Sequence, residues 1–182
     1  MKLPVKTLSL LIVGLLGTFC LAKAQTPHDF AISSAAFARG GAIPPGYTCK
    51  NATAGSPELS WQGVPEGAKS LALIMEDPDA PGRTFIHWVV YDIPANVTKL
   101  DAGVPLTEHL AAGGMQGVNS LGKIGYMGPC PPPGSAPHHY HFKLMALDAT
   151  LGLKPGATAA QVEAASGGHL KAQADLVGTF AR

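Results

Sequence analysis

The chain has 182 residues, with 13 Lys and Arg against 12 Asp and Glu, which gives a formal charge of +1 at neutral pH. This length suffices for one domain with a full hydrophobic core, and a second domain would have to be very small. The basic residues are scattered singly along the sequence, whereas nucleic-acid binding needs clustered Lys and Arg to neutralise phosphates. We therefore expect no nucleic-acid partner.

The first 24 residues have the pattern of a secretory signal peptide. Two lysines precede an apolar run over residues 8–21, and Ala22-Lys23-Ala24 ends it with small residues two positions apart. The run is short for a membrane span, and no stop-transfer segment follows it. We expect cleavage near Ala24 and an exported domain, residues 25–182, that is periplasmic or secreted and has no integral membrane segment.

Cleavage would remove three lysines and no acidic residue, so the remaining domain has a formal charge of −2. It keeps two cysteines, Cys49 and Cys130. In an oxidising compartment the pair is a disulfide candidate, although two buried free thiols fit the sequence equally well. The third cysteine, Cys20, follows Phe19 where a lipoprotein signal needs a small residue, so we expect no lipid attachment.

Short apolar segments separated by Gly and Pro predict a mostly β fold, an antiparallel sandwich with a small helical appendage. The expected strands cover residues 29–37, 57–61, 70–75, 84–93 and a segment that begins at 138. Thr158 is a candidate N-cap for a helix over residues 159–165. The alanine-rich composition predicts a second helix from residue 169 to about 177. Residues 100–117 are expected to form a loop.

One histidine lies inside an apolar strand. On simple alternation, His87 shares its face with Phe85, Val89 and Tyr91. A buried polar group in such surroundings needs a partner, because an unsatisfied donor costs about 1–3 kcal/mol. The residue is either part of a site or a structural histidine bonded to a carbonyl.

A Gly- and Pro-rich segment, residues 125–137, leads directly into a second histidine-containing strand. Proline fixes φ and removes a donor, so this segment is expected to be a stiff surface loop. Alternation then places His138 and Tyr140 toward the interior, with His139 and His141 on the opposite face. His138 as a site residue and His138 as a hydrogen-bonded cap of the core edge remain equal alternatives on this segment alone.

Two carboxylates follow the strand at residues 70–75. Asp77 and Asp79 flank a proline, so both side chains project from a stiff turn at the strand end. Asp and Pro are common in ordinary turns, and this motif by itself is weak evidence of a site.

Taken together, these segments resemble the phosphatidylethanolamine-binding protein family, and most closely its bacterial branch, the Raf kinase inhibitor-like proteins. The resemblance runs in order through nearly all of the expected mature chain. Its most informative motifs are Asp77-Pro78-Asp79-Ala80-Pro81, His87-Trp88, Gly128-Pro129-Cys130-Pro131-Pro132 and His138-His139-Tyr140.

The resemblance implies two antiparallel sheets with Greek-key connections, short C-terminal helices and one small anion-accepting pocket. It implies no catalytic residue, no metal and no cofactor. It also makes the Ala80–Pro81 bond a candidate cis peptide. The implied ligand-binding residues are Asp77, Asp79, His87, His138 and Tyr140. Residues 50–55 depart from the family pattern by one extra residue.

Such a pocket suits a phosphate-bearing or zwitterionic ligand such as phosphoethanolamine. The ammonium group would meet an aspartate, while the phosphate would meet histidine and tyrosine donors. Because protonation of imidazole favours an anion, we expect tighter binding near pH 6 than near pH 8.

Three other functions use the same sequence features. A metal-dependent phosphoesterase could be built from two Asp and two His, but the resemblance implies no obligate metal. A serine hydrolase would need a nucleophile elbow, and no GxSxG motif is present. The main alternative is a protein-interaction module that inhibits a protease or another regulatory protein through the loops around the pocket.

Overall fold

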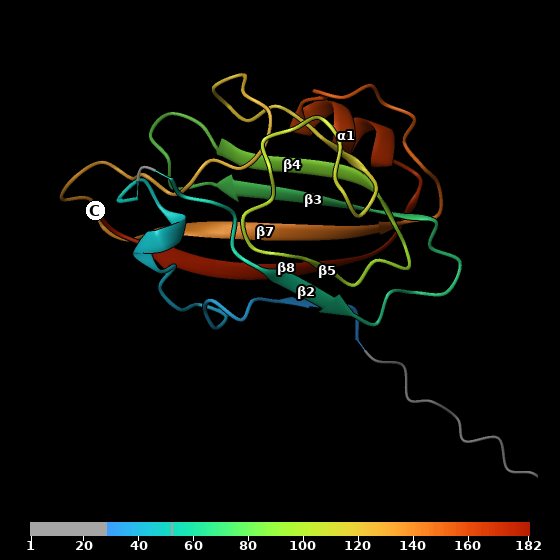
Figure 1. Cartoon of the computed structure of the whole chain (residues 1–182), viewed down its shortest axis with the longest axis horizontal. Helices are drawn as coiled ribbons and strands as arrows, with labels where there is room; N and C mark the ends of the chain where they lie inside the picture. Colours follow the sequence, from blue (N-terminus) through green and yellow to red (C-terminus); the bar gives the residue numbers. More distant parts are fainter. Residues whose placement is uncertain (1–28, 52) are drawn as a thin grey trace, which may run out of the picture.

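The computed structural model describes residues 29–51 and 53–182 (Figure 1). The expected signal peptide and its cleavage site lie outside the described residues. The elements in chain order are β1 (Ala31–Ser33), the 3-10 helix η1 (Pro45–Tyr47), β2 (Leu59–Gln62), β3 (Ser70–Asp77), β4 (Phe85–Pro94), β5 (Lys99–Leu100), β6 (Met115–Gln116), β7 (His138–Leu147), α1 (Ala159–Ser166) and β8 (Leu170–Phe180).

The strands form two antiparallel sheets. The small sheet has the order β1-β2-β5 and the large sheet the order β6-β4-β3-β7-β8, and Figure 1 shows the long strands of the large sheet stacked from β4 down to β8. Strands β3, β4 and β6 are neighbours in succession, and β7 returns to pair with the free side of β3. This is the Greek-key order, so the predicted sandwich and its connections are confirmed.

Apolar side chains fill two layers, one on each face of the large sheet. The main core lies between the sheets, where Trp61 from β2 and Leu100 from β5 pack with Leu73 and Phe142 of the large sheet. A second core lies on the opposite face and includes Val162 of α1. Because both faces are covered, β3 is buried over most of its length.

The helix α1 begins where the sequence predicts. The Thr158 hydroxyl accepts a hydrogen bond from the Gln161 N–H, and the Gln161 side chain accepts one from the Thr158 N–H, which completes a capping box.

The second predicted helix is wrong, because residues 170–180 form β8. The prediction followed alanine content, but Ala174 and Leu176 alternate with the more exposed Gln173 and Asp175. This period of two allows β8 to pair with β7 and to cover the core. Tertiary packing thus overrides the high intrinsic helix propensity of alanine, which amounts to less than about 1 kcal/mol per residue. The C-terminal segment therefore has one helix followed by a strand, in place of the expected short helices. Among the described residues no peptide bond is cis, so the expectation for Ala80–Pro81 is also wrong.

The face assignment in β4 needs a further correction at His87. Met75 pairs with Trp88 and Glu76 pairs with Ile86, so His87 is an extra residue in a β-bulge. The bulge places the His87 ring against Tyr140, on the side of the main core, whereas Val89 packs in the second core. Simple alternation fails here because one strand has one residue more than its partner.

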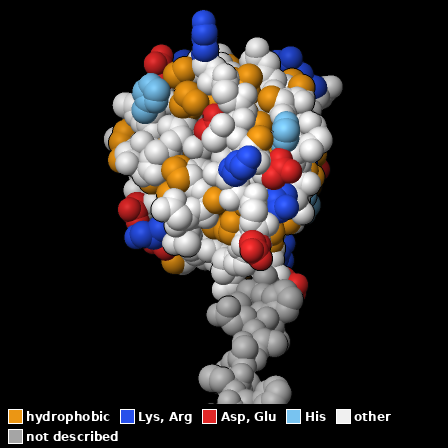
Figure 2. Space-filling model, turned by 90° about the vertical axis from the view of Figure 1, so that its right-hand side faces the viewer, with side chains coloured by type: hydrophobic (Ala, Val, Ile, Leu, Met, Phe, Trp, Pro, Cys, Tyr) orange, Lys and Arg blue, Asp and Glu red, His pale blue; other side chains and the backbone are white. Residues whose placement is uncertain are grey.

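The surface shows no concentration of one charge on the face seen in Figure 2, where Lys and Arg side chains are interspersed with Asp and Glu. Within the part of the chain that the structure describes, no helix is long and apolar enough to cross a membrane.

Candidate functional site

Three strand ends meet at one end of the large sheet. Because β3 runs antiparallel to both β4 and β7, the end of β3 lies beside the starts of its two neighbours. Asp77 is the last residue of β3 and pairs with Phe85, the first residue of β4, while His138 is the first residue of β7. Side chains that are distant in sequence therefore converge at this edge.

A cavity of about 200 Å³ lies at this edge. Its walls combine two imidazoles and one carboxylate with apolar side chains and the disulfide. The lining residues are Asp77, Ala80, Pro81, Phe85, His87, Met127, Cys130, Pro131, Pro132 and His138.

Asp77 and His138 form a buried pair in the wall of the cavity. Their residues are 3% and 6% exposed, and His138 Nδ1 lies 2.8 Å from Asp77 Oδ2. The second carboxylate oxygen accepts the backbone N–H of Asp79 at 2.9 Å. A carboxylate can only accept, so Nδ1 of His138 carries a proton and its Nε2 is the nitrogen left for a ligand.

His87 is held by a backbone carbonyl from the proline-rich loop. Its Nδ1 lies 2.8 Å from the oxygen of Met127, and the residue is 3% exposed. Burial lowers the pKa of His87, an effect only partly opposed by this hydrogen bond and by the charge of Asp77. His87 is therefore a neutral imidazole whose Nδ1–H donates to Met127.

Tyr140 lies beneath the two histidines. Its ring meets that of His87 nearly at right angles, with centroids 5.2 Å apart, and stacks on His138 at 6.5 Å. The residue is fully buried, yet its hydroxyl has no hydrogen-bond partner among the described residues. Burial, the charge of Asp77 and a side-chain contact with that carboxylate raise the pKa of Tyr140, so the phenol keeps its proton. The hydroxyl is enclosed by protein and does not belong to the cavity lining.

Asp79 is one of two expected site residues that the structure places outside the cavity lining; the other is Tyr140. Its Oδ2 accepts both the backbone N–H and the Nδ1–H of His139, each at 2.8 Å. These bonds lower the pKa of Asp79. The side chain joins the acidic turn to the start of β7 at the rim. Asp77, His87 and His138 line the cavity, whereas Tyr140 packs against the two histidine rings and does not reach the lining.

A covalent bond and a buried polar network hold the loop that forms one wall. Cys49 and Cys130 are joined by a disulfide with their Cα atoms 5.3 Å apart. The Tyr126 hydroxyl donates to the carbonyl oxygen of Tyr47 at 2.8 Å. The ring of Tyr126 packs edge-on against Trp88, the residue after His87. The loop is thus tied both to residues 47–49 and to β4.

Several functional positions are not evident from sequence. Met127 matters through its carbonyl oxygen, and no side-chain pattern points to a backbone acceptor. Phe85 could have been found, because it lies two residues before His87 on the same strand face. Its ring lies 4.9 Å from that of His87 and forms part of the cavity wall.

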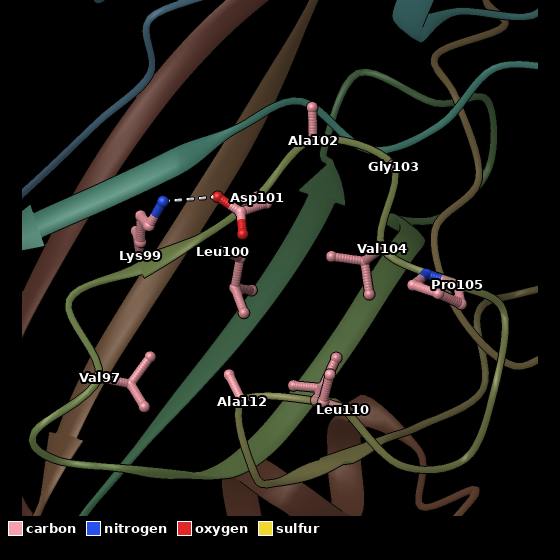
Figure 3. A pocket seen from close by; sticks show the side chains of 11 residues that line it. Val97, Lys99, Leu100, Asp101, Ala102, Gly103, Val104, Pro105, Leu110 and Ala112 are labelled. Atoms are coloured by element: carbon pink, nitrogen blue, oxygen red, sulfur yellow. Dashed lines mark hydrogen bonds and ion pairs between the residues drawn. The ribbon is translucent and has the colours of Figure 1, made fainter.

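A larger cavity of about 360 Å³ lies elsewhere, beside β5 (Figure 3). The side chains of Leu100, Val104 and Leu110 point into it, and its rim includes Lys99 and Asp101, which pair with each other at 2.8 Å. The smaller cavity is the better candidate because two buried imidazoles and a buried carboxylate converge on it.

Comparison with known proteins agrees with this fold. Residues 33–181 match the family model described as phosphatidylethanolamine-binding protein. A UPF0098 protein of Methanothermobacter thermautotrophicus is 48% identical over 147 residues, which cover 81% of this chain and 95% of that protein. The candidate lipoprotein LppC of Mycobacterium tuberculosis is 42% identical over 158 residues, which cover 86% and 75% of the two chains.

Solved structures give the same result. The phosphatidylethanolamine-binding protein homologue CT736 of Chlamydia trachomatis has a TM-score of 0.76 and 40% identity, and covers 84% of this chain and 97% of its own. YbcL of E. coli, described as a member of the mammalian family, has a TM-score of 0.78 and 33% identity, with 85% and 99% covered. The chain belongs to the phosphatidylethanolamine-binding protein family, as the sequence motifs predict.

Proposed function

We propose that this protein is an exported binding protein that takes a small phosphate-bearing anion into the cavity between β3, β4 and β7. The observation that supports this most directly is the convergence on one small cavity of two buried imidazoles, His87 and His138, each of which uses only its Nδ1 within the protein. A volume of about 200 Å³ suits a small headgroup rather than a large ligand. Export is supported by the N-terminal sequence pattern and by the similarity to the candidate lipoprotein LppC.

A zwitterionic ligand such as phosphoethanolamine fits the cavity through its phosphate. The expected contact between its ammonium and an aspartate has less support, because both oxygens of Asp77 already accept hydrogen bonds and Asp79 bonds to His139. The ammonium group would then lie toward the cavity mouth.

We propose binding rather than catalysis, with no resident metal or cofactor. Within residues 29–51 and 53–182, no group of three or more His, Cys, Asp or Glu side chains is placed to hold a metal ion. The cavity lining includes no serine or threonine, and Cys130 is in a disulfide.

Calorimetric titration of the purified protein with inorganic phosphate and with phosphoethanolamine tests the proposal. We expect saturable binding that is tighter near pH 6 than near pH 8, because imidazole protonation adds a donor and a positive charge. His138→Ala should abolish this binding. Absence of heat and of any ligand-induced change at both pH values would contradict the proposal.

The alternative of a protein-interaction module predicts a different result in the same variant. A stoichiometric partner recovered equally well by the wild type and by His138→Ala, in the absence of small-anion binding, would favour that alternative.

A further inference from the structure

The two histidines of the cavity present different chemistry to a ligand. His87 Nδ1 lies 2.8 Å from the Met127 carbonyl oxygen, which can only accept, so the ring proton is on Nδ1. The ring is 3% exposed and lies between those of Phe85 and Tyr140, at 4.9 and 5.2 Å. These surroundings disfavour a second proton, because the resulting charge would be poorly solvated. The Nε2 of His87 is therefore an acceptor.

The remaining polar groups near His87 do not supply a free donor to the cavity. The Tyr140 hydroxyl is enclosed by protein and is not among the groups that line the cavity. His138 has its Nδ1–H directed at Asp77, and that carboxylate places a negative charge in the cavity wall. The cavity thus presents the imidazole acceptor of His87 beside the Asp77 carboxylate.

An anion without protons is poorly matched to this acceptor. One of its oxygens would face the lone pair of His87 Nε2, and a buried polar group left without a partner is costly. An anion that retains a proton donates its O–H to that nitrogen instead. Hydrogen phosphate and singly protonated phosphate monoesters have such a proton, whereas sulfate at neutral pH does not.

We propose that His87 makes this site selective for protonated oxyanions of the phosphate class over sulfate. The inference rests on the proposed function and specifies the ligand class of the same cavity. The selectivity comes from unmatched hydrogen-bonding groups rather than from size, since phosphate and sulfate are nearly the same shape.

Parallel calorimetric titrations with inorganic phosphate and inorganic sulfate, at about pH 6.5 and equal ionic strength, test the proposal. We expect sulfate to bind at least ~10-fold more weakly, as an unmatched hydrogen-bonding group costs about 1–3 kcal/mol. Equal or tighter sulfate binding overturns the selectivity but leaves the anion site standing. Failure of both anions to bind overturns the proposed function itself.

A variant links the selectivity to the residue. His87→Gln replaces the acceptor by an amide that can turn its NH₂ toward an anion, so the phosphate preference should fall to about 3-fold or less. His169→Gln is the matched control, because His169 is exposed, bonds to Asp148 and lies outside the cavity. An unchanged preference in a folded His87→Gln protein contradicts the assignment.

Nitrogen NMR of the wild-type histidine rings gives a readout that needs no variant. The His87 ring should show a protonated Nδ1 and an unprotonated Nε2 at neutral pH. Phosphate should change the Nε2 resonance of His87, whereas sulfate should not. A protonated Nε2 in the ligand-free protein would overturn the inference even if His87→Gln failed to fold.

Discussion

Tyr140 shows how a single buried polar atom can affect stability. Its hydroxyl is enclosed and makes no hydrogen bond of normal geometry with the residues that the structure describes, so it lowers the stability of the protein. Tyr91 is the contrasting case, because its buried hydroxyl donates to the Lys154 carbonyl oxygen at 2.6 Å.

Removal of the two hydroxyls should therefore have opposite effects. We expect Tyr140→Phe to raise the free energy of unfolding by about 1 kcal/mol. Tyr91→Phe should lower the free energy of unfolding by about 1 kcal/mol. Urea denaturation measures both changes. A destabilised Tyr140→Phe protein would show that the Tyr140 hydroxyl has a stabilising partner in the folded state.

Asp79 makes stability depend on pH. Its pKa is lowered in the folded protein by the side-chain and backbone hydrogen bonds from His139. The stabilisation is therefore fully present above the ordinary carboxyl pKa of about 3.9, and it is lost as the pH falls through the lower value of the folded state.

The variant Asp79→Asn tests this dependence. Because it has no charge to protonate, its melting temperature should fall less steeply than that of the wild type between about pH 5 and pH 2. Asp29→Asn, at an exposed position before β1, serves as the control and should follow the wild type. If the melting temperatures of the wild type and of Asp79→Asn fall equally steeply with decreasing pH, the bond to His139 has no effect on stability.

At the scale of elements, the two-residue strand β6 is anchored mainly by one side chain. Gln116 is fully buried; its Oε1 accepts from Trp88 Nε1 at 2.7 Å, and its Nε2 donates to the carbonyl oxygens of Pro105 and Thr107 at the same distance. The network joins β6 to β4 and to a preceding loop, so a very short strand can hold the edge of the large sheet.

Gln116→Leu should lower the free energy of unfolding by about 2–3 kcal/mol, because the Trp88 N–H would lose its partner in a buried position. Gln173→Leu, on the exposed part of β8, should change it by less than about 0.5 kcal/mol. Equal small effects in the two variants, measured by chemical denaturation, would show that the network adds little to stability.

At the scale of the whole molecule, the disulfide joins two loops 81 residues apart in sequence. Such a link stabilises the fold mainly by restricting the unfolded chain, and the same link holds the proline-rich wall of the cavity in place. One bond therefore affects both global stability and the site.

Replacing both Cys49 and Cys130 by Ser should lower the free energy of unfolding by about 2–4 kcal/mol and weaken phosphate binding. A reducing agent should produce the same loss in the wild type and no further change in the double variant. Wild-type stability that is insensitive to complete reduction, verified by thiol titration, would contradict this prediction.

Local sequence patterns determined several parts of the secondary structure and of the buried surface. Alternation identified the buried face of β7, including His138 and Tyr140, and Thr158 marked the start of α1, because both signals depend only on neighbouring residues. The choice of Asp77, His87, His138 and Tyr140 as a set came from the family resemblance.

Only the tertiary structure decided how these side chains meet. The bulge that turns His87 toward Tyr140 and the carbonyl of Met127 that sets its tautomer arise from pairing between distant segments. The strand at residues 170–180 forms because β7 provides its hydrogen-bond partners, and Asp79 turns to His139 because the start of β7 lies beside the acidic turn. Sequence spacing says little about such contacts, since their free energy depends on groups brought together by the completed sheet.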